Sequence, residues 1–219
     1  MRRTTTILFA LIILGMTSTA CSVAEEVKGN APTKISSPVL FQDDFSDPSS
    51  GWSTLNEGNK NIGYQNGSFH FLVGEPKFDY WSTPGLSFKD THIEVNATKN
   101  SGPDDNDFGI ICRYQDEKNF YGLLISSDGY FGISKMKNGV HSILDADGMQ
   151  VSEAIKKGVS TNHLKADCIG NTLTLTVNDQ KLFDVHDDDF ASGDVGLVAG
   201  TFNQPGVDVS FNNFVVTRP

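Results

Sequence analysis

Acidic side chains dominate the segment FQDDFSDPSSGW (residues 41–52), where Asp43, Asp44 and Asp47 stand beside two phenylalanines and Trp52. Carboxylate oxygens gathered in this way suit a hard cation such as Ca²⁺. They also suit a structural role, because Asp47-Pro48 is a common start of a turn and would leave Trp52 buried beneath it. The spacing alone leaves both interpretations open.

A second acidic group occurs in GPDDNDF (residues 102–108), where Asp104, Asp105 and Asp107 precede an apolar segment. This spacing is similar to that of cation-binding loops. No glycine and distal glutamate complete an EF-hand, however. We therefore expect a solvated, turn-forming loop.

Motifs of the common enzyme classes are missing from the sequence. There is no Gly-x-Ser-x-Gly, no His-Glu-x-x-His and no phosphate-binding glycine loop. The five histidines are dispersed, without the spacing of metal ligands. We expect most of them to be ordinary surface or edge-strand residues. They are His70, His92, His141, His163 and His186.

The N-terminus predicts export. Arg2 and Arg3 precede an apolar run from Ile7 to Leu14, which is too short to cross a bilayer, so residues 1–20 are expected to be a signal peptide. The segment STAC, which ends at Cys21, resembles the lipobox of bacterial lipoproteins, although Ser18 stands where that pattern usually has Leu. The resemblance implies that Cys21 is lipidated, and the alternative is a secreted protein with a spare thiol.

Residues 21–38 contain small residues, prolines and scattered charges without apolar periodicity, so they are expected to be a flexible tether. Such a tether would hold a domain of residues 39–219 just off the extracytoplasmic side of the cell membrane. Removal of Arg2 and Arg3 with the signal peptide changes the formal charge from -10 to -12. That charge argues against nucleic acid and anionic lipid head groups as partners.

Two cysteines remain after Cys21. Because an exported chain meets an oxidising environment, a Cys112–Cys168 disulfide is the simplest interpretation. Two buried free thiols are the alternative. A bridge closing a loop of that size would stabilise the fold by about 4 kcal/mol.

Short alternating segments separated by turn residues predict an all-β sandwich or jelly roll. Hairpin turns are expected at Asn66-Gly67, Asp128-Gly129 and Asn138-Gly139. Residues 152–157 are expected to form a short helix between Ser152 and Gly158. The expected strands are residues 39–45, 68–73, 92–99, 107–115, 119–126, 130–136, 163–169, 172–178, 180–186, 193–199 and 207–217.

Pairing of the central strands assigns their two faces. A four-residue loop at 116–119 would set Arg113 opposite Gly122 and leave Cys112 and Leu123 on the core side. The other face would carry several glycines with Arg113 and Tyr130, forming a shallow groove. A curved sheet whose glycines relieve crowding would explain the same pattern.

Several stretches together resemble the concanavalin A-like lectin/glucanase superfamily, and in particular laminin G-like jelly-roll modules of bacterial lipoproteins. They are FQDDFSDPSSGW, DFGIICRYQDEKNFYGLLISSDGYFGISK, NHLKADCIGNTLTLTVNDQKL, GDVGLVAG and VSFNNFVV. The resemblance implies a two-sheet antiparallel jelly-roll sandwich whose concave sheet often carries a carbohydrate site. It also places the first and last strands side by side.

The resemblance further implies a calcium site at the chain ends, with Asp43, Asp44 and Asn212 as its ligands. Asn212 stands where related modules often have an acid, which would weaken the site. Related retaining glucanases carry a Glu-x-Asp-x-x-Glu strand. The nearest match, HIEVNATK, retains Glu94 but has Asn96 in place of the middle acid. We therefore expect no such catalysis.

Sugar recognition needs aromatic faces and polar side chains. The candidates are Tyr80 and Trp81 in the expected loop EPKFDYWSTPG, with Arg113 and Tyr130 on the expected concave face. The sequence predicts a membrane-tethered, non-catalytic module that binds a polysaccharide or another cell-surface ligand. The alternatives are a glycoside hydrolase and a protein-adhesion or structural module.

Overall fold

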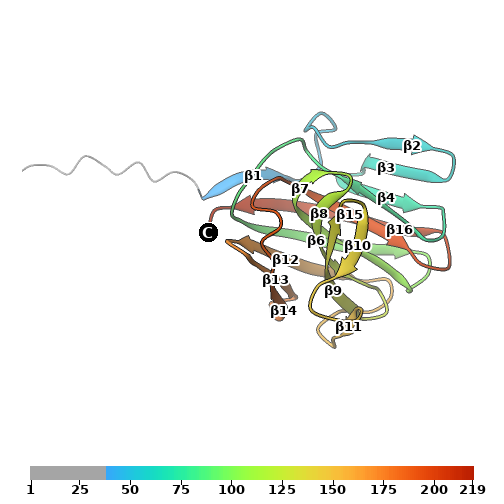
Figure 1. Ribbon diagram of the computed structural model, residues 1–219. Coiled ribbons are helices and arrows are strands. Elements are labelled where there is room, and N and C mark those ends of the chain that lie inside the picture. The colour runs from blue at the N-terminus through green and yellow to red at the C-terminus, as the bar shows by residue number, and fades with distance from the viewer. Residues whose placement is uncertain (1–37) are drawn as a thin grey trace, which may run out of the picture. The chain divides into compact units, whose positions relative to one another are not determined.

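The computed structural model describes residues 38–219, which form two antiparallel β-sheets packed face to face (Figure 1). The expected signal peptide, the expected lipidation site at Cys21 and the expected tether up to residue 37 lie outside the described residues. Within the described chain the secondary structure is strand, with no helix. The all-β prediction is confirmed, and the described part accordingly offers no apolar helix long enough to span a bilayer.

The nine-stranded sheet, here sheet A, runs in the order β14 (Gln180–His186), β13 (Thr172–Val177), β12 (Thr161–Ile169), β6 (Thr91–Ser101), β16 (Val207–Thr217), β4 (Ser68–Val73), β3 (Lys60–Gln65) and β2 (Leu55–Glu57). In it β1 (Val39–Asp43) also pairs with β16, so the first and last strands lie side by side as expected (Figure 1).

The seven-stranded sheet, here sheet B, runs in the order β10 (Val140–Ile143), β9 (Tyr130–Lys137), β8 (Asn119–Ile125), β7 (Asn106–Asp116), β15 (Asp194–Thr201) and β5 (Phe78–Ser82). The two-residue β11 (Gln150–Val151) also pairs with β9.

Alternating side chains of the two sheets form the core between them. On β6, Ile93, Val95 and Ala97 are fully buried, as their alternation predicts. The predicted Cys112–Cys168 disulfide is present and joins β7 of sheet B to β12 of sheet A. The bridge therefore fastens the two layers to each other.

All eleven expected strands are present, but five others were not predicted: β2, β3, β5, β10 and β11. The helix expected at residues 152–157 was wrong. The segment forms one turn, in which Ser152 Oγ accepts from Ala154 N. Two asparagine side chains take up backbone groups that a helix would need for its own hydrogen bonds. Asn162 accepts from Lys156 N and donates to Lys156 O. Asn178 Nδ2 donates to Ala154 O.

A β-bulge separates the β7–β8 hairpin from its expected register. Near the turn Asp116 pairs with Asn119, as the expected register requires, but Ile111 rather than Arg113 lies opposite Gly122. The bulge between Cys112 and Asp116 includes Arg113, whose φ of 53° is in the left-handed region. Cys112 still faces the core, while Arg113 is turned out of the regular alternation.

Candidate functional site

The outer face of sheet B, which looks away from sheet A, carries a second and smaller apolar cluster. Its buried members are Ile111, Phe120, Leu124 and Val198, one or two from each of β7, β8 and β15. Trp81 of β5 packs against them, with ring centroids 5.3 Å from Phe120. Because its members are buried, the cluster is a second small core beneath the outer surface of sheet B.

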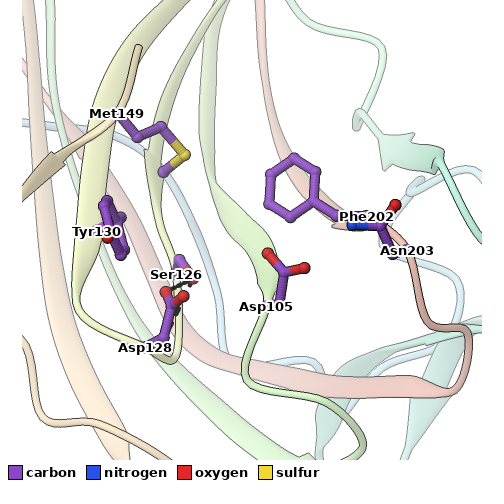
Figure 2. Close-up of a pocket in the computed structure, with 7 residues that line it drawn as sticks. All are labelled: Asp105, Ser126, Asp128, Tyr130, Met149, Phe202 and Asn203. Carbon is purple, nitrogen blue, oxygen red and sulfur yellow. Dashed lines mark hydrogen bonds between the residues drawn. The ribbon is translucent and has the colours of Figure 1, made fainter.

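A wide pocket, about 510 Å³ in volume, lies where the strands of this face end (Figure 2). Figure 2 shows Tyr130 and Met149 on one side of the pocket and Phe202 and Asn203 on the other, with the Asp105 carboxylate near the Phe202 ring. The remaining lining residues are Ser126 and Asp128.

Local turns determine the positions of the side chains that line the wide pocket. Tyr130 opens β9 directly after the three-residue turn at 127–129, in which Ser126 N donates to Tyr130 O (2.8 Å). Ser126 Oγ donates to Asp128, which fixes that carboxylate at the rim. The Tyr130 and Phe202 residues remain 41% and 37% exposed, so aromatic surface stays available in the pocket.

Two further carboxyls, those of the buried Asp107 and the exposed Asp79, meet on the same face above Gly200 of β15. Gly200 pairs with Asp79 of β5 on one side and with Asp107 of β7 on the other. A Cβ at position 200 would overlap Oδ1 of both aspartates. The two oxygens therefore share the space that only a glycine leaves free. We call Asp79 and Asp107 the acid pair.

The acid pair borders a narrow pocket of about 20 Å³, which includes Trp81, Phe120 and His141 in its lining. Burial, reinforced by the charge of Asp79, raises the pKa of Asp107 to about 8. Although β5 is an edge strand, the Asp79 carboxyl turns inward over Gly200, and desolvation raises its pKa also. Like charges this close favour one shared proton at neutral pH.

The wide and narrow pockets follow one another along the same strands. Asp105 of the wide pocket is two residues before Asp107, and Phe202 is two residues after Gly200. Two residues of strand span about 7 Å. The acid pair is thus about one sugar ring away from the wide pocket.

No protein-family model matches the chain, and neither does any curated protein. Solved structures do match. The carbohydrate-binding module CBM66 from Bacillus subtilis has 20% identity and a TM-score of 0.61, covering 77% of this chain and 96% of that one. The chain has a concanavalin A-like jelly-roll fold.

Two other structures with this fold support the assignment. A Bacillus subtilis protein of unknown function with a galectin-like fold has 12% identity and a TM-score of 0.56, covering 82% of this chain and 96% of that one. The β-glucanase of Bacillus licheniformis has 12% identity and a TM-score of 0.55, covering 82% and 98%. At these identities the comparisons concern the fold alone.

In this jelly roll, two of the four predicted sugar-contacting residues lie on the outer face of sheet B. Tyr130 lines the wide pocket and Trp81 the narrow one. Tyr80 and Trp81 belong to a strand rather than to the expected loop, so they point to opposite sides. Tyr80 packs against the main core, and its hydroxyl donates to Glu75 (2.9 Å).

Arg113 was predicted on the concave face, and the structure places it elsewhere. The residue is 2% exposed. Its guanidinium donates to Phe190 O (2.8 Å) and Gly170 O (2.7 Å), bonds that tie the bulge of β7 to neighbouring loops. The bulge accounts for the error, because a regular strand would have kept Arg113 on the face of Ile111.

The expected calcium ligands are not brought together as a set. Asp43 Oδ2 accepts from Trp52 Nε1 (2.9 Å), and its Oδ1 accepts from Phe45 N (2.7 Å). Asn213, not Asn212, lines the hollow beside Asp43 and Asp44. Within residues 38–219, no three His, Cys, Asp or Glu side chains are grouped to hold a metal ion.

The remnant of the glucanase pattern is on the wrong sheet for a site on sheet B. Glu94 belongs to β6 of sheet A, where it pairs with His163 (3.4 Å) and Lys165 (3.7 Å). It is therefore a surface residue on an amphipathic strand, as expected. The carboxyls that the fold does bring together, Asp79 and Asp107, come from strands that are distant in sequence.

Sequence reasoning missed Phe202, Asp79 and the burial of Asp107. The GPDDNDF segment did signal unusual acidity at Asp105 and Asp107, but it was interpreted as a solvated loop. No local pattern indicates that Asp79 and Asp107 meet, because their meeting depends on Gly200 standing between them in the sheet order.

Proposed function

We propose that residues 39–219 form a non-catalytic glycan-binding module whose ligand lies in the wide pocket. The observation that carries this proposal is the pair of exposed rings, Tyr130 and Phe202, beside the Asp105 and Asp128 carboxylates in a pocket of about 510 Å³. Aromatic faces suit the apolar side of a sugar ring, and carboxylates accept hydrogen bonds from its hydroxyls. The jelly-roll likeness to a carbohydrate-binding module agrees with it.

Electrostatics narrow the ligand class. In the described chain, neither set of pocket-lining residues includes a Lys or Arg, while four aspartates line the two pockets. These are Asp79, Asp105, Asp107 and Asp128. Sulfated or uronic acid polymers would be repelled by this face. Neutral or cationic glycans are therefore the expected ligands.

The geometry favours binding over hydrolysis. Glycosidases place two carboxyls on either side of the bond to be cut, with room for the sugar between them. The acid pair instead shares the space above Gly200, and its pocket of about 20 Å³ is too small for a sugar ring. These carboxyls cannot flank a glycosidic bond in this arrangement.

The test is depletion of residues 37–219 from solution by a panel of immobilised neutral, cationic and anionic polysaccharides. Both sheets and their core are contained in these residues. We expect selective depletion by neutral or cationic polymers. Tyr130→Ala and Phe202→Ala should each weaken binding about tenfold or more, as loss of a stacking face does.

Phe78→Ala is the matched control, because Phe78 is 49% exposed and lines neither pocket. This variant should bind as the parent does. Absence of depletion by every neutral and cationic polymer would refute the glycan proposal. Depletion that survives both aromatic substitutions would refute the proposed site.

We also propose that lipid on Cys21 holds this module at the extracytoplasmic side of the cell membrane. The support is the signal-like segment and the lipobox-like STAC. The full chain should partition into the membrane fraction and incorporate labelled fatty acid, while Cys21→Ser should do neither. Incorporation of label by the Cys21→Ser variant would contradict the assignment.

A further inference from the structure

The narrow pocket contains a buried carboxyl oxygen that lacks a partner. Asp107 is 6% exposed, and among the described residues its Oδ1 is one of two buried side-chain polar atoms without a hydrogen bond. Leaving a buried polar atom unpaired is costly, and more so for a charged one. Because this oxygen borders a pocket, a ligand group that enters the pocket could donate a hydrogen bond to it.

Within the described part of the chain, no lysine or arginine lines the narrow pocket, and its one basic side chain, His141, acts on the pKa of Asp79 and not on that of Asp107. The titratable side chains that face it are Asp79 on β5, Asp105 on its own segment and His141 on β10. From β8 it is faced by apolar positions, and from β15 by Gly200. A ligand group that binds Asp107 should carry a positive charge, because the neighbouring carboxyl of Asp79 is itself acidic.

The size of the narrow pocket limits what can enter. A space of about 20 Å³ exceeds the roughly 10–15 Å³ that one water-sized group needs, and it is far smaller than a sugar ring. An ammonium group is about the size of a water molecule. The rings of Trp81 and Phe120 in the lining would add cation–π attraction to such a group.

We propose that Asp79 and Asp107 form an ammonium-binding subsite, which selects an amino sugar when the neighbouring part of the glycan lies in the wide pocket. This inference rests on the proposed function. The spacing supports it, since Asp107 follows Asp105 by two residues, or about 7 Å of strand. A ring held beside Asp105 can therefore direct an amine into the narrow pocket.

The probes are two β-1,4-linked glucosamine pentamers, one with free amines and one fully N-acetylated. Calorimetric titration at about pH 6, where the amines are largely protonated, compares them on residues 37–219. We expect the free-amine pentamer to bind at least tenfold more tightly. Asp107→Asn and Asp79→Asn should each weaken this preference severalfold, because either variant leaves the ammonium one carboxyl where the parent offers two.

A second signature separates specific binding from attraction to an acidic protein. An ammonium that enters the acid pair displaces its shared proton, so the binding enthalpy of the parent should vary with the ionisation enthalpy of the buffer. Asp107→Asn should lose part of this dependence. Asp188→Asn makes the same chemical change at an exposed position outside both pockets, and it should change neither the preference nor the proton release.

The outcomes distinguish this inference from the proposed function. Equal affinity for the two pentamers, or a preference that neither Asp107→Asn nor Asp79→Asn reduces, would overturn the ammonium subsite. If Tyr130→Ala still weakened glycan binding in that case, the glycan-binding proposal would stand alone. Thermal melting of each variant verifies that it is folded, and Asp107→Asn is expected to melt above the parent.

Discussion

The acidic turn of residues 43–50 and the acid pair of Asp79 and Asp107 have the same side-chain chemistry but opposite hydrogen bonding. In the turn, the Asp43 carboxylate accepts from Phe45 N, Trp52 Nε1 and Ser50 Oγ. In the acid pair, Oδ1 of Asp107 accepts from no group of the described chain. The carboxylate of the acidic turn holds the fold together, whereas a carboxyl oxygen of the acid pair remains free to accept a hydrogen bond from a ligand.

The pKa values of the two regions move in opposite directions. Hydrogen bonds from Ser46 lower the pKa of Asp44, and hydrogen bonds from Ser49 lower that of Asp47. Burial raises the pKa of Asp107 and Asp79. Density of acidic residues is therefore a poor guide to a binding site, whereas unpaired acceptors are a better one.

The largest effect that we expect comes from Asp43→Ala. The substitution leaves the Trp52 indole N–H and the Phe45 N–H buried without an acceptor, and Phe45 is held at a φ of 62° that its side chain disfavours. We expect a loss of about 3 kcal/mol in the free energy of unfolding, measured by urea denaturation.

Asp43→Asn is the control for that experiment, since its amide oxygen can still accept one of these bonds and its loss should be smaller. A loss below about 1 kcal/mol in Asp43→Ala would show that Asp43 does not organise the turn. The acidic turn would then not owe its structure to the hydrogen bonds of Asp43.

The second effect has the opposite sign: Asp107→Asn should stabilise the protein. Because the pKa of Asp107 is raised in the folded state, the folded form holds its proton where the unfolded form has lost it. Parent stability should fall as the pH rises from about 4, the ordinary range of an aspartate, to about 8. The variant lacks this loss, so its Tm advantage should grow over that window and level off above it.

Asp105→Asn provides the contrast, because it makes the same chemical change at a carboxyl that is exposed at the wide pocket. It should lack the Tm advantage of Asp107→Asn, because an exposed carboxyl keeps its contact with water in the folded state. A Tm advantage of Asp107→Asn that is absent at pH 8 would mean that the carboxyl is not held in an unfavourable site.

Much of this fold could be predicted from the sequence. Alternation locates eleven of the sixteen strands of the described chain, and hairpin dipeptides such as Asn138-Gly139 adopt the positive φ values that they require. Paired cysteines in an exported chain predict the Cys112–Cys168 bridge. These features rest on local chemistry or on a choice among few partners.

The site could be predicted only in part, because it depends on register and strand order. Tyr130 was placed correctly by its hairpin. Arg113 was not, since it lies in a bulge where three residues of β7 face one residue of β8, and such a bulge has no signal in sequence. Asp79 and Asp107 meet through Gly200 of a third strand, so no window of sequence contains all three.

A smaller effect is expected from Asp47→Ala in the acidic turn. Asp47 is exposed, and its carboxylate accepts from Ser49 N (2.9 Å) in a turn that Asp43 already organises. The Tm should fall by a small fraction of the fall in Asp43→Ala. Because the pKa of Asp47 is lowered in the folded state, this contribution is present above the ordinary aspartate range and lost as the pH falls through the folded value.

The Tm difference of Asp47→Ala from the parent therefore has the opposite sign to that of Asp107→Asn. Both differences should shrink toward acid, because each parent carboxyl is then protonated in the folded and the unfolded state. Melting curves between about pH 3 and pH 8 separate the two, since one variant lies below the parent and the other above it. If both variants melted above the parent, or both below it, hydrogen-bonded and unpaired carboxyls would not differ in their effect on stability.

The smallest effect is expected from calcium. A calcium site whose Kd is 100-fold lower than the added Ca²⁺ concentration would stabilise the fold by about 2.7 kcal/mol. Such a stabilisation would raise the Tm by several degrees. At the acidic turn both Asp43 oxygens are already bonded, and Asn212 Oδ1 accepts from Asn96 (3.1 Å), so few free ligands remain there. Melting in millimolar Ca²⁺ and in chelator should therefore coincide. A rise of several degrees that Asp44→Ala removes would show instead that the turn rearranges to release its carboxylates, and the contrast with the acid pair would become one of degree.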